Sequence, residues 1–221
     1  MINLLTYNVP HRKTYDVLCL LKAKGYKNIS VYAKPFSYKK TYKPLIEHRP
    51  IMIYQNIDYI KNFAEKYIEI KDYSEIVAGK NEIFLICGAT FLPDSFIETY
   101  KIINSHPGYI PQMRGLDSFK WAIYEDLPIG VSTHIINKNY IDTGEIIERK
   151  IVDVYKNDTF HAVAYRQYEL EILMLVNAIS KINEQHEFIK PDLKEVRKRM
   201  PNNIEESLIE KFETYKNKWG K

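Results

Sequence analysis

The sequence predicts an α/β fold in which a mostly parallel, twisted sheet carries helices on both faces. Short apolar runs typical of buried strands recur along the chain, and helical patterns separate them. No internal repeat interrupts this alternation. At 221 residues, of which 45% are hydrophobic and 27% charged, the chain can bury one substantial core.

The first half of the chain alternates strands and helices. An apolar run predicts a strand at residues 2–5, and Tyr15, Leu18 and Leu21 then recur at helical spacing before Gly25 ends the helix. A second run predicts a strand at residues 29–33. The remaining elements of this half are helices at 57–66, 73–78 and 93–99 and strands at 67–70, 82–87 and 100–103.

The second half predicts longer elements. They are a helix at 118–125, strands at 130–136 and 145–152, and a long helix at 159–182. After Pro191 the chain is highly charged, and apolar residues from Ile204 to Tyr215 recur at helical spacing. We therefore expect one domain over residues 1–190 and a helical tail over residues 191–221, too short to form a second core.

The composition argues against several classes of protein. No window approaches eighteen apolar residues, and the first residues do not resemble a secretory signal, so we expect a cytoplasmic protein that does not bind membranes. Cys19 and Cys87 form no CxxC pair, and the six histidines show no metal-ligand spacing. We therefore expect neither a disulfide nor a metal site.

The basic residues are concentrated near the N-terminus. Residues 1–50 contain ten Lys and Arg but only Asp16 and Glu47 as acidic residues, although the whole chain has a net charge of +4. This excess predicts an anionic partner, with a solvated basic surface as the alternative. No nucleic-acid-binding motif accompanies the charge, so we do not expect a nucleic-acid partner.

Four polar residues interrupt apolar strand-like runs. Asn104 and His106 are predicted just past the strand at residues 100–103, and His134 and Asp142 accompany the two strands of the second half. Each has an ordinary interpretation as a turn former or a satisfied histidine. Together, an amide, an imidazole and a carboxylate suit acyl transfer, because they can stabilise an oxyanion and move a proton near neutral pH.

Two stretches carry a family resemblance. INSHPGYIPQMRGLDSFKWAI, followed by GVSTHIINKNYIDTGEII, resembles the formyltransferase family that uses 10-formyltetrahydrofolate. The matching positions are Asn104, His106, Pro107, Gly108, Ile110, Pro111, Gly115, His134, Asp142 and Gly144. The resemblance implies a Rossmann-like formyltransferase fold and an enzyme that transfers a one-carbon group without a metal.

The resemblance also implies roles for individual residues. Asn104 is expected to donate to the formyl oxygen, His106 to accept the proton of the attacking amine, and Asp142 to hold the proton-transfer network. The pterin of the co-substrate is expected against backbone groups of two loops. These loops contain Ala89, Thr90, Phe91 and Leu92, and Asn139, Tyr140, Ile141 and Thr143.

Among the branches of this family, the sequence most resembles the sugar N-formyltransferases. Purine-pathway members carry a glycine-rich phosphate loop after the first strand, whereas TYNVPHRKTYDVL contains no glycine. We expect a nucleotide-linked amino deoxysugar of bacterial surface glycan synthesis as the formyl acceptor, and tetrahydrofolate as the product of the co-substrate. The residues expected to bind the acceptor are Tyr7, Asn8, His11, Arg12, Lys13, His48 and Arg49, and Tyr38 and Tyr42 are candidates for stacking on its base.

Three alternatives stay open at this point. The chain could be a phosphoribosylglycinamide formyltransferase-like enzyme, or a non-catalytic binding protein on the same scaffold. The amphipathic helix of the tail could form a homodimer surface or pack on its own domain.

Overall fold

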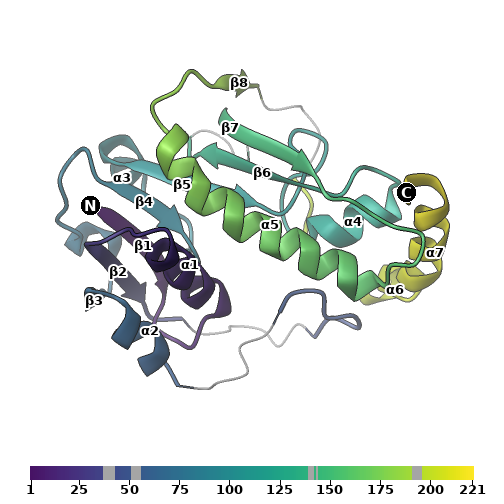
Figure 1. The fold of residues 1–221 in the computed structure, drawn as a ribbon, viewed down its shortest axis with the longest axis horizontal. Coiled ribbons are helices and arrows are strands. Elements are labelled where there is room, and N and C mark those ends of the chain that lie inside the picture. The colour runs from purple at the N-terminus through teal and green to yellow at the C-terminus, as the bar shows by residue number, and fades with distance from the viewer. Residues whose placement is uncertain (37–42, 51–55, 139–141, 143, 191–195) are drawn as a thin grey trace.

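The computed structural model describes residues 1–36, 43–50, 56–138, 142, 144–190 and 196–221. Within these ranges the strands form one sheet of eight, in the order β3-β2-β1-β4-β5-β6-β7-β8 (Figure 1). The first five in chain order run parallel: β1 (Ile2–Tyr7), β2 (Ile29–Lys34), β3 (Lys66–Glu69), β4 (Ile83–Ile86) and β5 (Lys101–His106). The last three are antiparallel: β6 (Gly130–Ile135), β7 (Gly144–Ile151) and β8 (Glu187–Ile189).

Helices cover both faces of the sheet. They are α1 (Arg12–Ala23), α2 (Asp58–Phe63), α3 (Asp94–Thr99), α4 (Ser118–Tyr124), α5 (Phe160–Lys181), α6 (Asn202–Glu205) and α7 (Leu208–Trp219). The helices α1 and α5 lie side by side on one face, and α5 runs along β5 and β6 (Figure 1). The predicted α/β fold class with a mostly parallel sheet is confirmed.

Successive side chains of β1 enter two hydrophobic cores, one on each face of the sheet. Leu4 packs with Leu18 of α1 and Leu175 of α5 on one face of the sheet. Leu5 packs with Phe84 and Phe96 on the other. Since successive side chains of a strand point to opposite faces, the apolar run of β1 is buried on both sides, as expected for a central parallel strand.

A third core joins the tail to the rest of the chain. Leu208, Phe212 and Tyr215 of α7 are buried, and the Phe212 ring centroid lies 5.7 Å from that of Phe160. The Tyr215 hydroxyl donates to the Leu127 carbonyl at 2.9 Å. The apolar face of the tail helix thus packs on the chain itself, while the division at residue 190 and a homodimer stay predictions.

Two sequence predictions need correction, and one strand was missed. The helix expected at residues 73–78 is a single 3-10 turn, Tyr73–Glu75, because the Asp72 capping box closes one turn and Ile76 is already extended. The strand expected at 100–103 continues to His106, because its last residues pair with β6. The short edge strand β8 was not predicted. No helix in the described ranges is long and apolar enough to cross a membrane.

Candidate active site

The last residues of β5 and the middle of β6 bring the predicted catalytic residues together. Asn104 pairs with His134 and His106 with Ser132 in the antiparallel register. Because Asn104 and His106 are two residues apart on a strand, their side chains lie on the same face. The Asn104 Nδ2 atom lies 3.3 Å from His134 Nε2, within hydrogen-bond distance.

His106 is held on both sides of its ring. Its Nε2 atom lies 3.1 Å from the Met113 carbonyl oxygen and 3.2 Å from the Ser118 hydroxyl. Its Nδ1 atom lies 3.4 Å from Asp142 Oδ2. His106 is only 4% exposed, so its ring is almost entirely shielded from solvent.

Asp142 is the most exposed of the three charged or ionisable residues of this cluster, His106, His134 and Asp142. Its backbone is left-handed, with φ of 48°, and its Oδ2 atom accepts a 2.8 Å hydrogen bond from the Gly115 amide. Its Oδ1 atom lies 3.9 Å from His134 Nε2. The side chain keeps 13% of its surface exposed, more than either histidine. The carboxylate therefore connects the buried imidazole to the open side of the site.

Two glycines are required by close approach. A Cβ atom on Gly108 would lie 2.5 Å from His106 Nε2 and 2.6 Å from the Met113 carbonyl oxygen. A Cβ atom on Gly115, whose φ is +93°, would lie 2.2 Å from the Arg197 carbonyl oxygen. Gly108 thus lets the loop backbone lie against the imidazole, and Gly115 lets it lie against Arg197.

The contacts of His106 define where a proton can be placed. A carbonyl oxygen only accepts, so Nε2 must carry the hydrogen that bonds Met113. The lone pair of a neutral ring is then on Nδ1, which faces the Asp142 carboxylate. Uptake of a proton at Nδ1 creates an imidazolium–carboxylate pair, so the site can receive a proton from a reacting group.

The first predicted pterin loop leaves the sheet beside Asn104. Leu85 of β4 pairs with Ile103, so the chain after Ile86 passes the end of β5. Phe91 is 87% exposed, and the Thr90 amide donates to the Tyr73 hydroxyl at 3.2 Å. An exposed aromatic ring on an anchored loop fits a flat ligand. The other predicted pterin residues, Asn139, Tyr140, Ile141 and Thr143, and the candidates Tyr38 and Tyr42, lie outside the described residues.

Three predicted acceptor-binding residues lie at the same end of the parallel strands as the first pterin loop. A Cβ atom on Gly88 would meet the Tyr7 ring at 2.8 Å and His11 at 3.2 Å, so both side chains approach the start of the pterin loop. Asn8 Oδ1 accepts a 2.9 Å hydrogen bond from the Tyr67 hydroxyl. Tyr7, Asn8 and His11 therefore gather at the carboxyl ends of the parallel strands, where ligands of open α/β sheets bind.

The predicted basic residues already have carboxylate partners. Arg12 pairs with Asp16 at 2.7 Å, and Lys13 and Arg49 both pair with Glu171, at 2.7 and 2.5 Å. Burial alone would raise the pKa of Glu171, but the charges of Arg49 and Lys13 hold the pKa at about 2. Three cations share two carboxylates, so the cluster retains one net positive charge.

The two histidines predicted to bind the acceptor are held neutral. Burial, reinforced by Lys13 and Arg49, lowers the pKa of His11 to about 4. Burial, reinforced by Lys120, lowers the pKa of His48 to about 3, and the His48 ring stacks on Phe119 at 5.7 Å.

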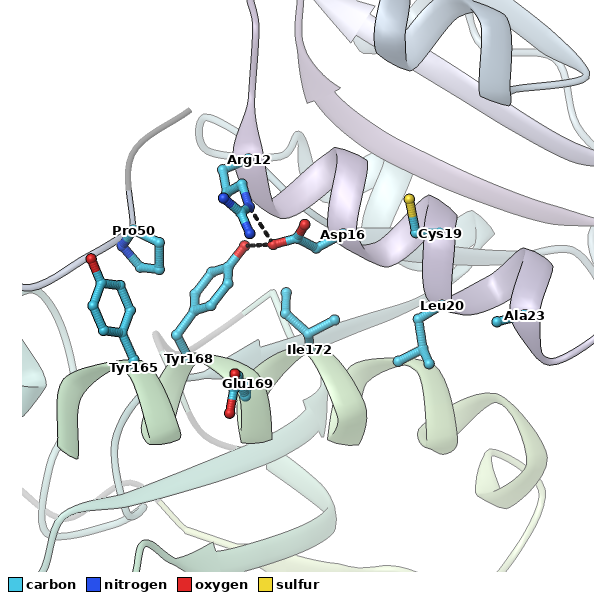
Figure 2. A pocket seen from close by; sticks show the side chains of 10 residues that line it. All are labelled: Arg12, Asp16, Cys19, Leu20, Ala23, Pro50, Tyr165, Tyr168, Glu169 and Ile172. Atoms are coloured by element: carbon cyan, nitrogen blue, oxygen red, sulfur yellow. Dashed lines mark hydrogen bonds and ion pairs between the residues drawn. The ribbon is translucent and has the colours of Figure 1, made fainter. Parts of the chain in front are cut away.

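A separate pocket lies between α1 and α5. Its volume is about 740 Å³, and Arg12, Asp16, Tyr165 and Tyr168 line it (Figure 2). Asp16 accepts from both Arg12 and the Tyr168 hydroxyl across the pocket, as the dashed lines in Figure 2 show. The three predicted catalytic residues do not line this pocket.

The sequence predictions missed two residues that shape the site. Ser118 contacts His106. In the sequence it could be noticed only as a polar residue at the start of a predicted helix. Glu171 joins Lys13 and Arg49, and it was detectable as a carboxylate on the mostly apolar face of the long helix.

Comparison with known protein families identifies the class of enzyme to which this fold and site belong. The model of the formyl transferase family matches residues 63–179, more than half of the chain. The chain belongs to this family.

Individual relatives include two kinds of enzyme. The trifunctional purine biosynthetic protein adenosine-3 of Chironomus tentans is 28% identical over 136 residues, which are 59% of this chain and 10% of that protein. The GDP-perosamine N-formyltransferase of Brucella melitensis is 29% identical over 123 residues, 48% of this chain and 47% of that protein. The matched regions thus span less than half the length of both curated relatives.

Solved structures share the fold. The N-formyltransferase of Helicobacter canadensis, solved with folinic acid and dTDP-3-aminofucose, superposes with a TM-score of 0.59 at 20% identity. That match covers 87% of this chain and 67% of the other.

Proposed function

We propose that the chain transfers a formyl group from 10-formyltetrahydrofolate to the amino group of a nucleotide-linked amino sugar. The observation that carries this proposal is the convergence of Asn104, His106 and Asp142 at the end of β5. When bound, 10-formyltetrahydrofolate supplies the formyl carbon, and the loop of Ala89 to Leu92 after β4, on which Phe91 is 87% exposed, is our candidate to hold its pterin.

Each residue of the triad has a distinct task in this reaction. The amide of Asn104 donates to the formyl oxygen as negative charge develops there, a contribution of about 10²–10³ in rate for such donors. The amine nitrogen forms a bond to the formyl carbon while the bond from that carbon to the folate nitrogen breaks. His106 accepts the amine proton at Nδ1, Asp142 holds this proton-transfer network in place, and the proton passes on to the released folate nitrogen. Positioned proton acceptors of this kind contribute about 10²–10⁴. The hydrogen bond from Gly115 keeps the Asp142 carboxylate in place throughout.

Two features favour a nucleotide-linked sugar as the acceptor. The turn between β1 and α1 contains no glycine, so it lacks the backbone loop that cradles a phosphate in purine-pathway members of the family. The cluster of Arg12, Lys13 and Arg49 retains one net positive charge, and the Arg49 side chain is 35% exposed. An anionic diphosphate can be attracted to this cluster. We extend the proposal to a cytoplasmic enzyme of bacterial surface glycan synthesis; a homodimer stays a prediction that α7 does not support, because its apolar face packs on the chain itself.

The second candidate is glycinamide ribonucleotide as acceptor. The similarity to the trifunctional purine biosynthetic protein favours it. A non-catalytic binding protein is the third possibility, but it has no physical need for an imidazole and a carboxylate held 3.4 Å apart.

Substitution of the triad tests the mechanism. His106→Ala and Asp142→Asn should each lower kcat by at least about 10², because both act in proton transfer. Asn104→Ala should cost about 2.7–4 kcal/mol of transition-state stabilisation. Ser105→Ala is the matched control, since Ser105 lies on the same strand and hydrogen-bonds Thr133 on the other face of the sheet. A His106 or Asp142 variant that keeps more than about a third of the wild-type kcat would contradict the assigned roles.

A substrate panel tests the acceptor. Amino-sugar nucleotides and glycinamide ribonucleotide are each assayed with 10-formyltetrahydrofolate, and TDP and UDP are tested by thermal unfolding. A diphosphate at about 100 times its Kd should stabilise the chain by about 2.7 kcal/mol, or very roughly 5–10 °C in Tm. Turnover of glycinamide ribonucleotide, with no response to either diphosphate, would assign the chain to purine synthesis.

A further inference from the structure

The loop from Met113 to Ser118 makes most of the protein contacts of the His106–Asp142 pair. Met113 and Ser118 contact Nε2 of His106, and the Gly115 amide bonds Oδ2 of Asp142. One short loop therefore sets the ring and the carboxylate relative to each other. Whatever fixes this loop also fixes the geometry for proton transfer.

The outer side of the loop is bonded to the C-terminal segment at residues 197–200. The Arg197 amide donates to the Arg114 carbonyl at 3.0 Å, and the Leu116 amide donates to the Arg197 carbonyl at 2.8 Å. These two bonds form a parallel bridge between Gly115 and Arg197. The segment thus extends the loop by one strand-like pairing on the side away from Asp142.

Side chains secure the same contact. Asp117, which is 5% exposed, accepts a 3.0 Å hydrogen bond from the Met200 amide. The Trp121 indole donates to the Lys198 carbonyl at 2.8 Å. The Arg197 guanidinium pairs with Glu125 at 2.6 Å.

The segment is itself anchored in the core. Glu205, which is fully buried, pairs with the buried ammonium of Lys120 on α4 and accepts a 2.6 Å bond from the Leu45 amide. The apolar face of α7 follows, with Phe212 against Phe160. Separation of a buried ion pair is costly, so the segment cannot shift freely.

We propose that residues 197–200 form a positioning element for catalysis, with Asp117 as the residue that couples it to the loop. This inference rests on the proposed formyl transfer and adds a role for the C-terminal tail. The element acts through the loop and contacts neither the formyl donor nor the amine. Its loss should therefore lower kcat while leaving KM for both substrates nearly unchanged.

The test compares Asp117→Gly with Asp117→Asn. Asp117 has a left-handed backbone with φ of 51°, which both glycine and asparagine tolerate. Asparagine retains an oxygen that can accept from the Met200 amide, and glycine does not. Asp117→Gly should lower kcat by roughly 10- to 100-fold, because displacements near 1 Å have costs of this size. Asp117→Asn should stay within about threefold of wild type.

Two further readouts separate positioning from general stability. The pH profile of kcat should shift in Asp117→Gly but not in Asp117→Asn, because only the first loosens the loop that holds His106 and Asp142. If Asp117→Gly does not fold, Trp121→Phe removes the bond to Lys198 while keeping an aromatic ring. That variant should lower kcat by severalfold at unchanged KM.

Amide hydrogen exchange tests the same proposal without any substrate. The Gly115 amide should exchange at least about tenfold faster in Asp117→Gly than in Asp117→Asn, since local opening exposes it. Equal exchange rates and equal kcat in the two variants would overturn the positioning role. A rise in KM at constant kcat would overturn it as well, because it would assign the segment to substrate binding. If wild type shows no formyl transfer but the exchange rates differ as expected, the proposed function fails and the coupling of segment to loop stands.

Discussion

Lowering the pH from 7 to 5 should destabilise this protein through two partly buried histidines. Burial lowers the pKa of His11 from 6.5 to about 4 and that of His48 from 6.5 to about 3. At pH 5 both rings are neutral in the folded chain, whereas an unfolded chain binds a proton at each. Acid therefore favours unfolding from pH 7 down to about pH 4 for His11 and about pH 3 for His48, below which the folded rings also take up protons.

The size of the effect follows from proton linkage. Each histidine should reduce the free energy of unfolding by about 2 kcal/mol between pH 7 and pH 5, since one pKa unit corresponds to about 1.4 kcal/mol. The full sum is about 4 kcal/mol, and partial contact of the rings with water reduces it toward about 2 kcal/mol. For a chain with a stability of about 5–15 kcal/mol this is a large fraction.

Urea unfolding of wild type and of the His11→Gln, His48→Gln double variant measures the effect. The double variant should lose most of the pH dependence between pH 7 and pH 5, whatever its absolute stability. Raising the salt concentration should leave most of the wild-type dependence, because burial is the largest cause of both shifts. A double variant with the wild-type pH dependence would refute this reasoning.

Three further substitutions test individual contacts. Gly108→Ala should lower kcat at least about tenfold, because the new Cβ atom would lie 2.5 Å from His106 Nε2 and displace the ring; wild-type kinetics would contradict this. Phe212→Ala should reduce the free energy of unfolding by about 3–5 kcal/mol in urea titrations, since it empties a buried site against Phe160. Glu171→Gln should cost about 3–5 kcal/mol at pH 7, because it leaves Lys13 and Arg49 with no carboxylate, and a Tm equal to wild type would exclude the buried ion cluster.

The candidate catalytic residues could be picked out from the sequence because their signal is local, and the structure brings them together. Asn104 and His106 lie in one strand, and Asp142 lies in a turn signal between two others, so the sequence pattern itself carries the site. Strand termini were less predictable. The pairing of Asn104 with His134 extends β5 beyond its apolar run, and polar residues within a strand resemble the start of a loop.

The basic N-terminal quarter shows where sequence reasoning is limited. Charge counting predicted an anionic ligand there, but Glu171, from outside this quarter of the chain, pairs with both Lys13 and Arg49. Glu171 lies more than 120 residues from Arg49 in the sequence, so no local pattern pairs them. The prediction that these cations bind a diphosphate remains untested, and the net positive charge of the cluster still permits it.

By itself the sequence predicted the α/β class, most of the strands and helices in their order along the chain, and the candidate amide, imidazole and carboxylate. These follow from short-range patterns of apolar spacing, turn residues and motif order. Only the tertiary structure decided which groups hold them: Gly115 on Asp142, Met113 on His106, and Arg197 on the loop between. Each of these contacts uses a backbone amide or carbonyl, and those to Asp142 and Arg197 join residues far apart in the chain. Backbone amides and carbonyls are common to almost every residue, so the sequence carries no mark of their pairing until the chain has folded.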